Sequence, residues 1–306
     1  YHQFRKDNYS FDYIFCDEVQ DLPKSILEKM KANAKYVISG GDENQSIYDT
    51  DPQPPHELVV NSSEIGNILN ANSWILTTIY RLPKSLVKLV SIFMPSMGIL
   101  SSKTDNTKKD ITPNLTKGSS KEKEVEYIIS NAQTKLAIGE NAVIILPGHD
   151  SVVEFVNIAL SQADKNIWDP EDPKNKNKWE KTDFGSLNRH LRNNNINIEY
   201  IGNSYGDLYN NGNTDKIIVM TYHSSKGLDF DNVYLPFMGT HYDKAMYYFN
   251  DTLFMVGMTR SKLSLTITYS GSMNNYTTRI ENNCNKIDID NIMSRSVSDF
   301  DDDFDF

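Results

Sequence analysis

The sequence contains little cysteine, no long apolar run and no excess of basic residues. Only two cysteines, Cys16 and Cys284, occur in 306 residues, which excludes a disulfide-stabilised scaffold and is typical of a reducing compartment. No run of about 18 apolar residues occurs, so the sequence predicts no transmembrane helix and no membrane partner. No secretory signal opens the chain, and we therefore expect a cytoplasmic location.

The charge balance is acidic. Lysine and arginine total 31 against 41 aspartates and glutamates, a formal net charge of −10. This balance excludes a basic protein that coats nucleic acid. It still allows an enzyme that binds nucleic acid in a local groove.

Short apolar runs alternate with amphipathic segments along the chain. Apolar runs at 13–16 and 36–38 flank a predicted helix that begins near Lys24. Later runs at 143–146, 217–220, 233–235 and 263–269 alternate with predicted helices at 125–136, 152–160 and 251–260. Strands joined by helices favour right-handed crossovers and parallel sheets, so we expect an α/β fold with buried strands. The polar stretches 98–124 and 162–197 are interpreted as a surface loop and an irregular insertion.

Acidic and amide side chains follow the first two predicted strands. Residues 17–21 (DEVQD) come directly after the first strand, and residues 41–48 (GDENQSIY) come after the second. One carboxylate can hold magnesium while its neighbour orients or deprotonates a water molecule, as nucleotide hydrolysis requires. Acids also cap helix N-termini, so the first motif alone leaves a structural role open. The second motif places the Gln45 amide beside the same strand ends.

Three further segments carry polar groups after apolar ones. They are residues 76–81 (LTTIYR), 221–230 (TYHSSKGLDF) and 255–262 (MVGMTRSK). In order and spacing, all five segments resemble motifs II to VI of the UvrD/Rep/PcrA-like superfamily 1 DNA helicases, over residues 13–269. The resemblance implies two RecA-like α/β domains that bind ATP and Mg²⁺ between them and hold single-stranded DNA across their tops.

The resemblance also implies roles for individual residues at the nucleotide. Asp17 matches the magnesium-binding acid, Glu18 the catalytic base, and Gln45 the glutamine that senses the γ-phosphate. Arg81 and Arg260 match two arginines of the second domain that reach the γ-phosphate. Such arginines neutralise transition-state charge, which ties hydrolysis to domain movement.

The motif at 221–230 is expected to contact both nucleotide and DNA. Gly227 and Asp229 are expected beside the nucleotide, where Asp229 replaces the usual glutamate that contacts the ribose. Thr221 and His223 match positions that bind the DNA backbone, and Tyr48 matches a base-stacking position. Phe230 is interpreted as a core aromatic residue. Lys226 is either an ion-pair partner or a phosphate contact.

The sequence departs from the family pattern in three places. No G-x-x-x-x-G-K-[ST] phosphate loop occurs, although that loop precedes motif II in the family. Two acids, Asp49 and Asp51, follow Tyr48 where relatives have a base-stacking tryptophan run. The segment 162–197 is too short for the extra domain of the large relatives.

These observations predict an incomplete first domain over residues 1–75, a second domain over 76–285 and an acidic disordered tail over 286–306. The missing N-terminal half, from the same gene or another chain, would supply the phosphate loop. We therefore expect the C-terminal part of an ATP-dependent DNA helicase or translocase, moving 3′ to 5′ on single-stranded DNA and inactive alone. The alternative is a non-catalytic helicase-like module that binds DNA or a protein partner.

The last nine residues, 298–306 (SDFDDDFDF), combine aspartates with three phenylalanines. They are predicted to be disordered, and an acidic solubilising tail is one interpretation. The segment is also similar to the acidic, Phe-terminated tip of bacterial single-stranded DNA-binding proteins. By that resemblance the tail would recruit a replication or repair protein, with Phe306 as the anchor.

Overall fold

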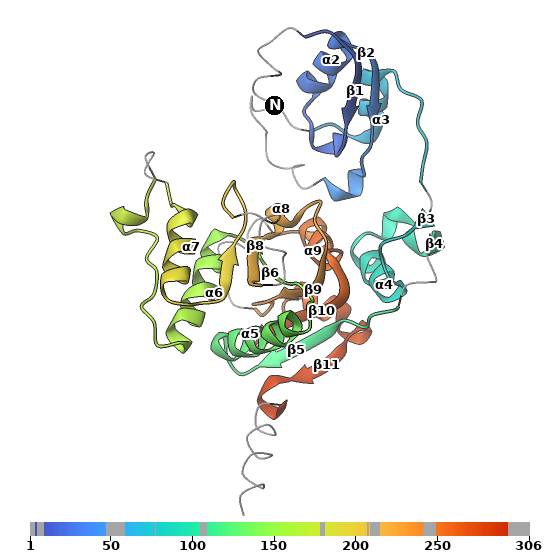
Figure 1. The fold of residues 1–306 in the computed structure, drawn as a ribbon. Helices are drawn as coiled ribbons and strands as arrows, with labels where there is room; N and C mark the ends of the chain where they lie inside the picture. Colours follow the sequence, from blue (N-terminus) through green and yellow to red (C-terminus); the bar gives the residue numbers. More distant parts are fainter. Residues whose placement is uncertain are drawn as a thin grey trace, which may run out of the picture. The chain divides into compact units, whose positions relative to one another are not determined.

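The computed structural model describes residues 4, 9–46, 59–76, 78–104, 109–177, 181–206, 208, 215–240 and 249–292. The chain divides into two compact units, Tyr1–Thr77 and Thr78–Phe306, which we describe separately (Figure 1). Tyr48 and residues 293–306 lie outside the described residues, so the predictions for Tyr48 and for the segment 298–306 stay predictions. The prediction of a disordered tail over 286–306 is wrong for its first residues, because residues 285–288 form a strand that pairs with residues 114–117.

The first unit is built around a two-stranded parallel sheet. Its elements are β1 (Phe11–Cys16), η1 (Val19–Asp21), α2 (Lys24–Asn33), β2 (Ala34–Ser39), η2 (Glu43–Gln45) and α3 (Ser62–Leu69). The strands pair with Tyr13 opposite Tyr36, as the predicted β-α-β unit requires. On one face of the sheet a small core buries Val19, Ile26, Leu27, Met30 and Ile65. At α3 the Asn61 and Glu64 side chains form a reciprocal capping box, which fixes where that helix begins.

The opposite face of this sheet is exposed and apolar. Tyr13 is 55% exposed, Phe15 75%, Tyr36 50% and Ile38 51%, and the Tyr13 and Tyr36 rings stack at 5.1 Å. The prediction that strand 13–16 is buried is therefore wrong for this face. Parallel sheets are normally covered on both faces, whereas helices cover one face here within the described residues.

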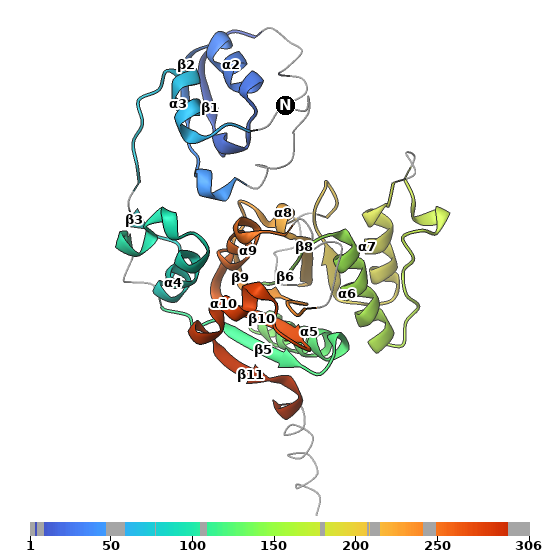
Figure 2. The ribbon, with the colours of Figure 1, turned by 180° about the vertical axis from the view of Figure 1, so that it is seen from behind.

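The second unit contains a larger sheet with seven strands in the order β11-β5-β10-β9-β6-β8-β7, every neighbouring pair parallel. The strands are β5 (Asn114–Gly118), β6 (Ala142–Leu146), β7 (Ile198–Tyr200), β8 (Ile217–Thr221), β9 (Phe230–Leu235), β10 (Ser261–Ser270) and β11 (Asn285–Asp288). The longer helices are α4 (Lys84–Phe93), α5 (Lys121–Ala137), α6 (His149–Gln162), α7 (Phe184–Asn193) and α9 (Asp251–Met258). Short elements include the parallel pair β3 (Thr78–Ile79) and β4 (Lys103–Thr104), with α8 (Tyr222–Ser225) and α10 (Asn275–Ile280). Figure 2 shows the same arrangement from behind.

Both faces of the larger sheet are covered. Ile144 and Leu146 of β6 belong to a core with Phe155 of α6, while the alternate residues Val143 and Ile145 point to the other face. All four strand residues are fully buried. The predicted α/β class with parallel sheets is confirmed.

Two segments predicted to be irregular contain regular structure. The stretch 98–124 includes β5, which pairs with β10 and β11, and it also contains the first turn of α5. The sequence of β5, NLTKG, lacks an apolar run, so its pairing on both sides decides its conformation. The insertion 162–197 includes α7, whose Phe184, Leu187 and Leu191 have helical spacing and are buried. Many asparagines around α7 obscured that spacing.

No single helix in the described part of the chain is long and apolar enough to cross a membrane. Helix α4 and the turns at 95–101 reach the length and apolar composition of a membrane span only when they are taken together, and the pair is bent by 116°. Most apolar residues of α4 are buried within the second unit, namely Leu86, Val87, Leu89, Val90 and Phe93.

Candidate active site

The candidate catalytic acids lie at the carboxyl end of β1. Asp17 is exposed directly after the strand, and the backbone N–H of Glu18 donates to Asp17 Oδ1 at 2.9 Å. Glu18 has a left-handed backbone, with φ 51° and ψ 45°. Such a conformation is unfavourable for a residue with a Cβ, and strain of this kind is concentrated at functional sites.

The segment after β2 is hydrogen-bonded to the segment after β1. Gly40 N–H donates to the Cys16 carbonyl at 2.9 Å, and Val19 N–H donates to the Gly40 carbonyl at 3.0 Å. These bonds bring Asp17, Glu18 and Gln45 to the same edge of the sheet. The carboxyl ends of parallel strands are where open α/β sheets bind ligands.

Two residues of this edge were missed as site residues, although both lie inside the motifs. Gln20 is 2% exposed, and its Nε2 donates to Glu18 Oε2. Asp42 accepts from Gln45 Nε2 at 3.0 Å through Oδ2. A polar residue between the acids of residues 17–21 was the available signal for Gln20.

In the second unit, the structure brings Arg81, Asp229 and Arg260 together. Arg81 NH1 lies 3.1 Å from Asp229 Oδ1, an ion pair that is partly exposed. Arg260 is 1% exposed, and its guanidinium donates to the Val256 carbonyl at 2.9 Å and the Leu228 carbonyl at 3.2 Å. The predicted nucleotide residues of this unit therefore meet at the segment that precedes β9.

Glycine is required at Gly227 by the backbone, which has φ +78° there. The turn at Gly227 leads from α8 to Asp229. Phe230 is buried, which agrees with its interpretation as a core residue, and its N–H donates to the Arg260 carbonyl at 2.9 Å.

The two predicted DNA-binding residues of this unit lie at the start of α8. Thr221 caps the helix: its Oγ1 accepts from Ser224 N–H at 3.2 Å and lies 3.0 Å from Ser224 Oγ. His223 is exposed on the same turn. The Tyr200 hydroxyl lies 3.0 Å from His149 Nε2, at the N-terminus of α6.

His149 is held neutral by its surroundings. Asn203 Nδ2, which can only donate, lies 3.0 Å from His149 Nε2, so this nitrogen is the acceptor. The ring packs 4.7 Å from Phe184, and burial lowers the pKa of His149. His149, Asn203 and Tyr205 line a cavity of about 490 Å³ near the carboxyl end of β7.

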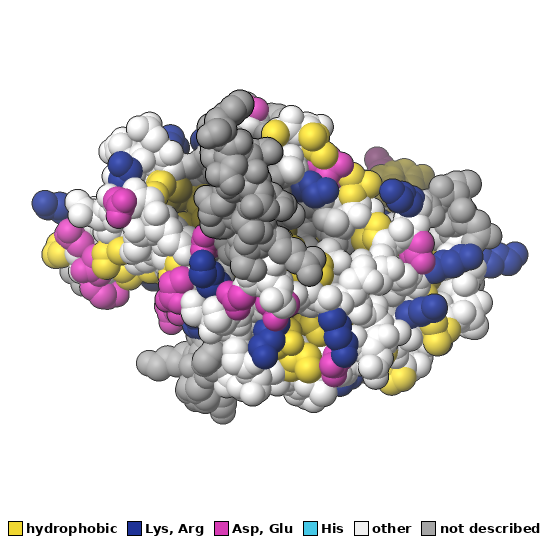
Figure 3. Space-filling model, turned by 90° about the horizontal axis from the view of Figure 1, so that it is seen from below, with side chains coloured by type: hydrophobic (Ala, Val, Ile, Leu, Met, Phe, Trp, Pro, Cys, Tyr) yellow, Lys and Arg dark blue, Asp and Glu magenta, His cyan; other side chains and the backbone are white. Residues whose placement is uncertain are grey.

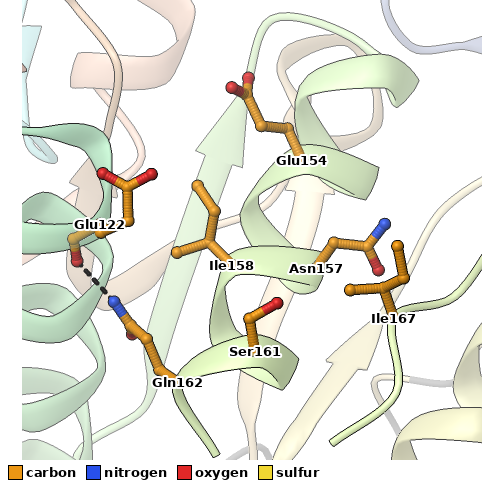
Figure 4. A pocket seen from close by; sticks show the side chains of 7 residues that line it. All are labelled: Glu122, Glu154, Asn157, Ile158, Ser161, Gln162 and Ile167. Carbon is orange, nitrogen blue, oxygen red and sulfur yellow. Dashed lines mark hydrogen bonds between the residues drawn. The ribbon is translucent and has the colours of Figure 1, made fainter. Parts of the chain in front are cut away.

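A second cavity, of about 420 Å³, lies between α5 and α6 (Figure 4). Glu122 and Glu154 line it, and Gln162 Nε2 donates to the Glu122 carbonyl at 2.7 Å. None of the predicted site residues lines this cavity. On the face in Figure 3, acidic and basic side chains are intermixed. No cluster of three or more potential metal ligands occurs among the described residues.

The fold and these residues define an α/β protein with candidate nucleotide-binding groups at strand ends. Residues 177–272 match the family model described as UvrD-like helicase C-terminal domain. Residues 177–272 are therefore similar to the C-terminal domain of UvrD-like helicases. A crystal structure described as the C-terminal domain of a possible DNA helicase from Lactobacillus plantarum WCFS1 is similar at 14% identity with a TM-score of 0.40. That match covers 68% of this chain and 98% of the other. No curated protein matches the chain.

Proposed function

We propose that the chain is the C-terminal part of an ATP-dependent DNA helicase or translocase that moves 3′ to 5′ on single-stranded DNA. The observation that carries the proposal is the grouping of Asp17, Glu18 and Gln45 at the carboxyl end of β1 and β2. Acids and an amide at that edge are the groups that nucleotide hydrolysis needs. The family match over 177–272 supports the helicase class.

Asp17 would hold the magnesium ion of Mg-ATP. Its exposed carboxylate suits magnesium, which nucleotide sites bind through one or two carboxylates plus substrate phosphates. The bound ion would neutralise charge on the phosphates. Glu18 would accept the proton of the attacking water, and Gln45 would contact the terminal phosphate.

The second unit would supply positive charge to the same phosphates. Arg81 would exchange its ion pair with Asp229 for the terminal phosphate, and Asp229 would then be available for the ribose. Arg260 would exchange its bonds to the Val256 and Leu228 carbonyls in the same way. Such exchange would link nucleotide binding to a rearrangement at residues 227–230.

The exposed apolar face of β1 and β2 supports completion of the first unit by further polypeptide. We propose that its occupant carries the phosphate-binding loop that residues 1–306 lack. Tyr13, Phe15, Tyr36 and Ile38 would be covered by that polypeptide. Burying such aromatic groups supplies a large part of interface stability.

Single-stranded DNA would bind through Thr221, His223 and Tyr48. With a net charge of −10, few phosphates would be neutralised, so binding should be weak and depend on salt as for roughly one to three phosphates. The tail 298–306 would recruit a replication or repair protein, and the location would be cytoplasmic. The observation that supports the alternative, a non-catalytic module, is the absence of a phosphate loop from residues 1–306.

The test is ATP hydrolysis with magnesium, with and without single-stranded DNA. Residues 1–306 alone should show negligible activity, and the protein together with the polypeptide that carries the phosphate loop should show DNA-stimulated hydrolysis. Robust hydrolysis by residues 1–306 would refute the assigned role of the missing loop. No hydrolysis by the completed protein would favour the non-catalytic module.

A further inference from the structure

Gln20 uses both ends of its buried side-chain amide. Nε2 donates to Glu18 Oε2, and Oε1 accepts from the Asp42 backbone N–H at 3.1 Å. The residue is 2% exposed, so water does not replace either partner readily. One side chain thus joins the acid after β1 to the backbone after β2.

The backbone approaches this amide so closely that only glycine fits beside it. A Cβ at Gly41 would lie 2.3 Å from Gln20 Oε1 and 3.0 Å from Val19 Cγ1. Any larger residue at 41 would displace Gln20 or the chain that leads to Asp42. The two segments are therefore held in one fixed arrangement.

The same connection continues from Asp42 to Gln45. Asp42 Oδ2 accepts from Gln45 Nε2 at 3.0 Å, while Oδ1 accepts from Asn44 N–H at 3.0 Å. An ionised carboxylate only accepts, so the amide nitrogen of Gln45 must face Asp42. The Gln45 carbonyl oxygen therefore points away from Asp42, in an orientation that Asp42 sets.

From this chain of contacts we propose that Gln20 is a positioning residue that couples Glu18 to Gln45. It holds the Glu18 carboxylate in its left-handed turn and, through Asp42, fixes the orientation of the Gln45 amide. A movement of Gln45 toward or away from a phosphate is thereby transmitted to Glu18. The catalytic meaning of this coupling rests on the proposed function, whereas the coupling itself does not.

Only an amide of this length meets both demands, because it donates to a carboxylate and accepts from a backbone N–H. Gln20→Glu keeps the acceptor for Asp42 and replaces the donor to Glu18 by a like charge. Gln20→Leu removes both contacts at similar size. Gln133, exposed on α5 in the second unit, provides matched control variants Gln133→Glu and Gln133→Leu.

The first measurement follows backbone and side-chain amide signals of residues 1–306 by NMR. Glu18→Gln should shift the Asp42 backbone signal and the Gln45 side-chain signals. When Glu18→Gln is combined with Gln20→Leu, the shift that it causes at Gln45 should be at least about twofold smaller. Exchange of the Asp42 amide hydrogen should rise about tenfold in Gln20→Leu and stay near the native rate in Gln20→Glu. If Glu18→Gln shifts the Gln45 side-chain signals equally with native Gln20, with Gln20→Leu and with Gln20→Glu, the coupling is overturned.

The second measurement uses the completed protein that hydrolyses ATP. Gln20→Glu should slow single-turnover hydrolysis by about 10- to 100-fold, with nucleotide affinity nearly unchanged. A purely structural residue would change the hydrolysis rate and the nucleotide affinity together, so native kinetics in Gln20→Glu would overturn the positioning role. Absence of hydrolysis in the unsubstituted protein would instead overturn the proposed function and the catalytic meaning, while the NMR result would still decide the coupling.

Discussion

The two units of this chain protect their parallel sheets to very different degrees. In the second unit the inner strands β6 and β8 are buried on both faces, and Val143, Ile144 and Ile145 are all fully buried. In the first unit two strands have helices on one face, and Phe15 on the other face is 75% exposed. The unit with the candidate catalytic acids is thus the one with the smaller core.

The larger hydrophobic core and the candidate catalytic acids therefore lie in different units. Hydrophobic stabilisation grows with the apolar area removed from water, so the second unit should dominate the stability of the chain. Asp17 and Glu18 lie in the first unit, whose core is small. A small loss of stability in that unit should therefore disturb the positions of both acids. Covering the exposed apolar face would therefore stabilise the edge that carries the candidate catalytic acids as well as the fold.

The largest expected effect contrasts a buried and an exposed phenylalanine. Phe155→Ala, in the core of the second unit, should lower the free energy of unfolding by about 3–5 kcal/mol. Phe15→Ala should change that free energy by less than about 0.5 kcal/mol, because its ring is already exposed. Denaturant titration followed by fluorescence of Trp168, buried in the second unit, reports the first variant, and amide exchange in β1 reports the second. Equal losses in both would contradict the contrast between the units.

The next effect concerns the chemistry of the first unit. In the completed protein, Glu18→Gln should slow ATP hydrolysis by at least ~10², equivalent to about 2.7 kcal/mol, because the proposed general base is lost. Single-turnover kinetics measure this loss. Glu28→Gln, the same chemical change on the exposed side of α2, is the control and should leave the rate within about twofold. A fast Glu18→Gln enzyme would remove the catalytic role from this residue.

Two helical glycines sharpen the comparison of packing. Gly257→Ala in α9 should destabilise the chain by about 1–3 kcal/mol, because its Cβ would lie 2.2 Å from the buried Tyr222 ring. Gly66→Ala in α3 meets nothing within 4 Å, so it should stabilise the first unit by about 0.5–1 kcal/mol. Thermal unfolding followed by amide exchange assigns each change to its unit. The free energy of unfolding should fall in Gly257→Ala and rise in Gly66→Ala. Changes of the same sign in both variants would show that the packing around one of the two glycines differs from that described.

Sequence reasoning reached the fold class because apolar runs such as 13–16 and 143–146 really are parallel strands. It missed β5, whose burial comes from pairing with β10 and β11 and not from an apolar run. It also missed the exposed face of β1, since apolar residues do not reveal from sequence which face is left uncovered. At the candidate site the motifs supplied the acids, but the bond from Gln20 to Asp42 joins residues 22 positions apart. Such a contact depends on the close approach at Gly41, which only the folded chain shows.

The smallest effect is a pH dependence in the second unit. The folded chain holds His149 neutral, because burial lowers its pKa below 6.5 and Asn203 donates to Nε2. The unfolded chain then binds the proton more readily, so this contribution to stability is complete above pH 6.5 and is lost as pH falls below it. Tyr200 lies 3.0 Å from His149, Asp150 opposes the effect of burial, and Glu171, Lys181 and Tyr205 line the same cavity as His149.

His149→Gln, which cannot titrate, should remove this loss between pH 6.5 and 5, and His190→Gln should retain it. The difference should be under about 1 kcal/mol, because the ring is partly exposed and solvent screens its charge. Denaturant unfolding of the three proteins at each pH measures it. An acid loss in His149→Gln as large as in the native chain would come from other titratable groups, such as Asp110 and Glu122, whose pKa values are lowered in the folded chain. That result would contradict the assignment to His149.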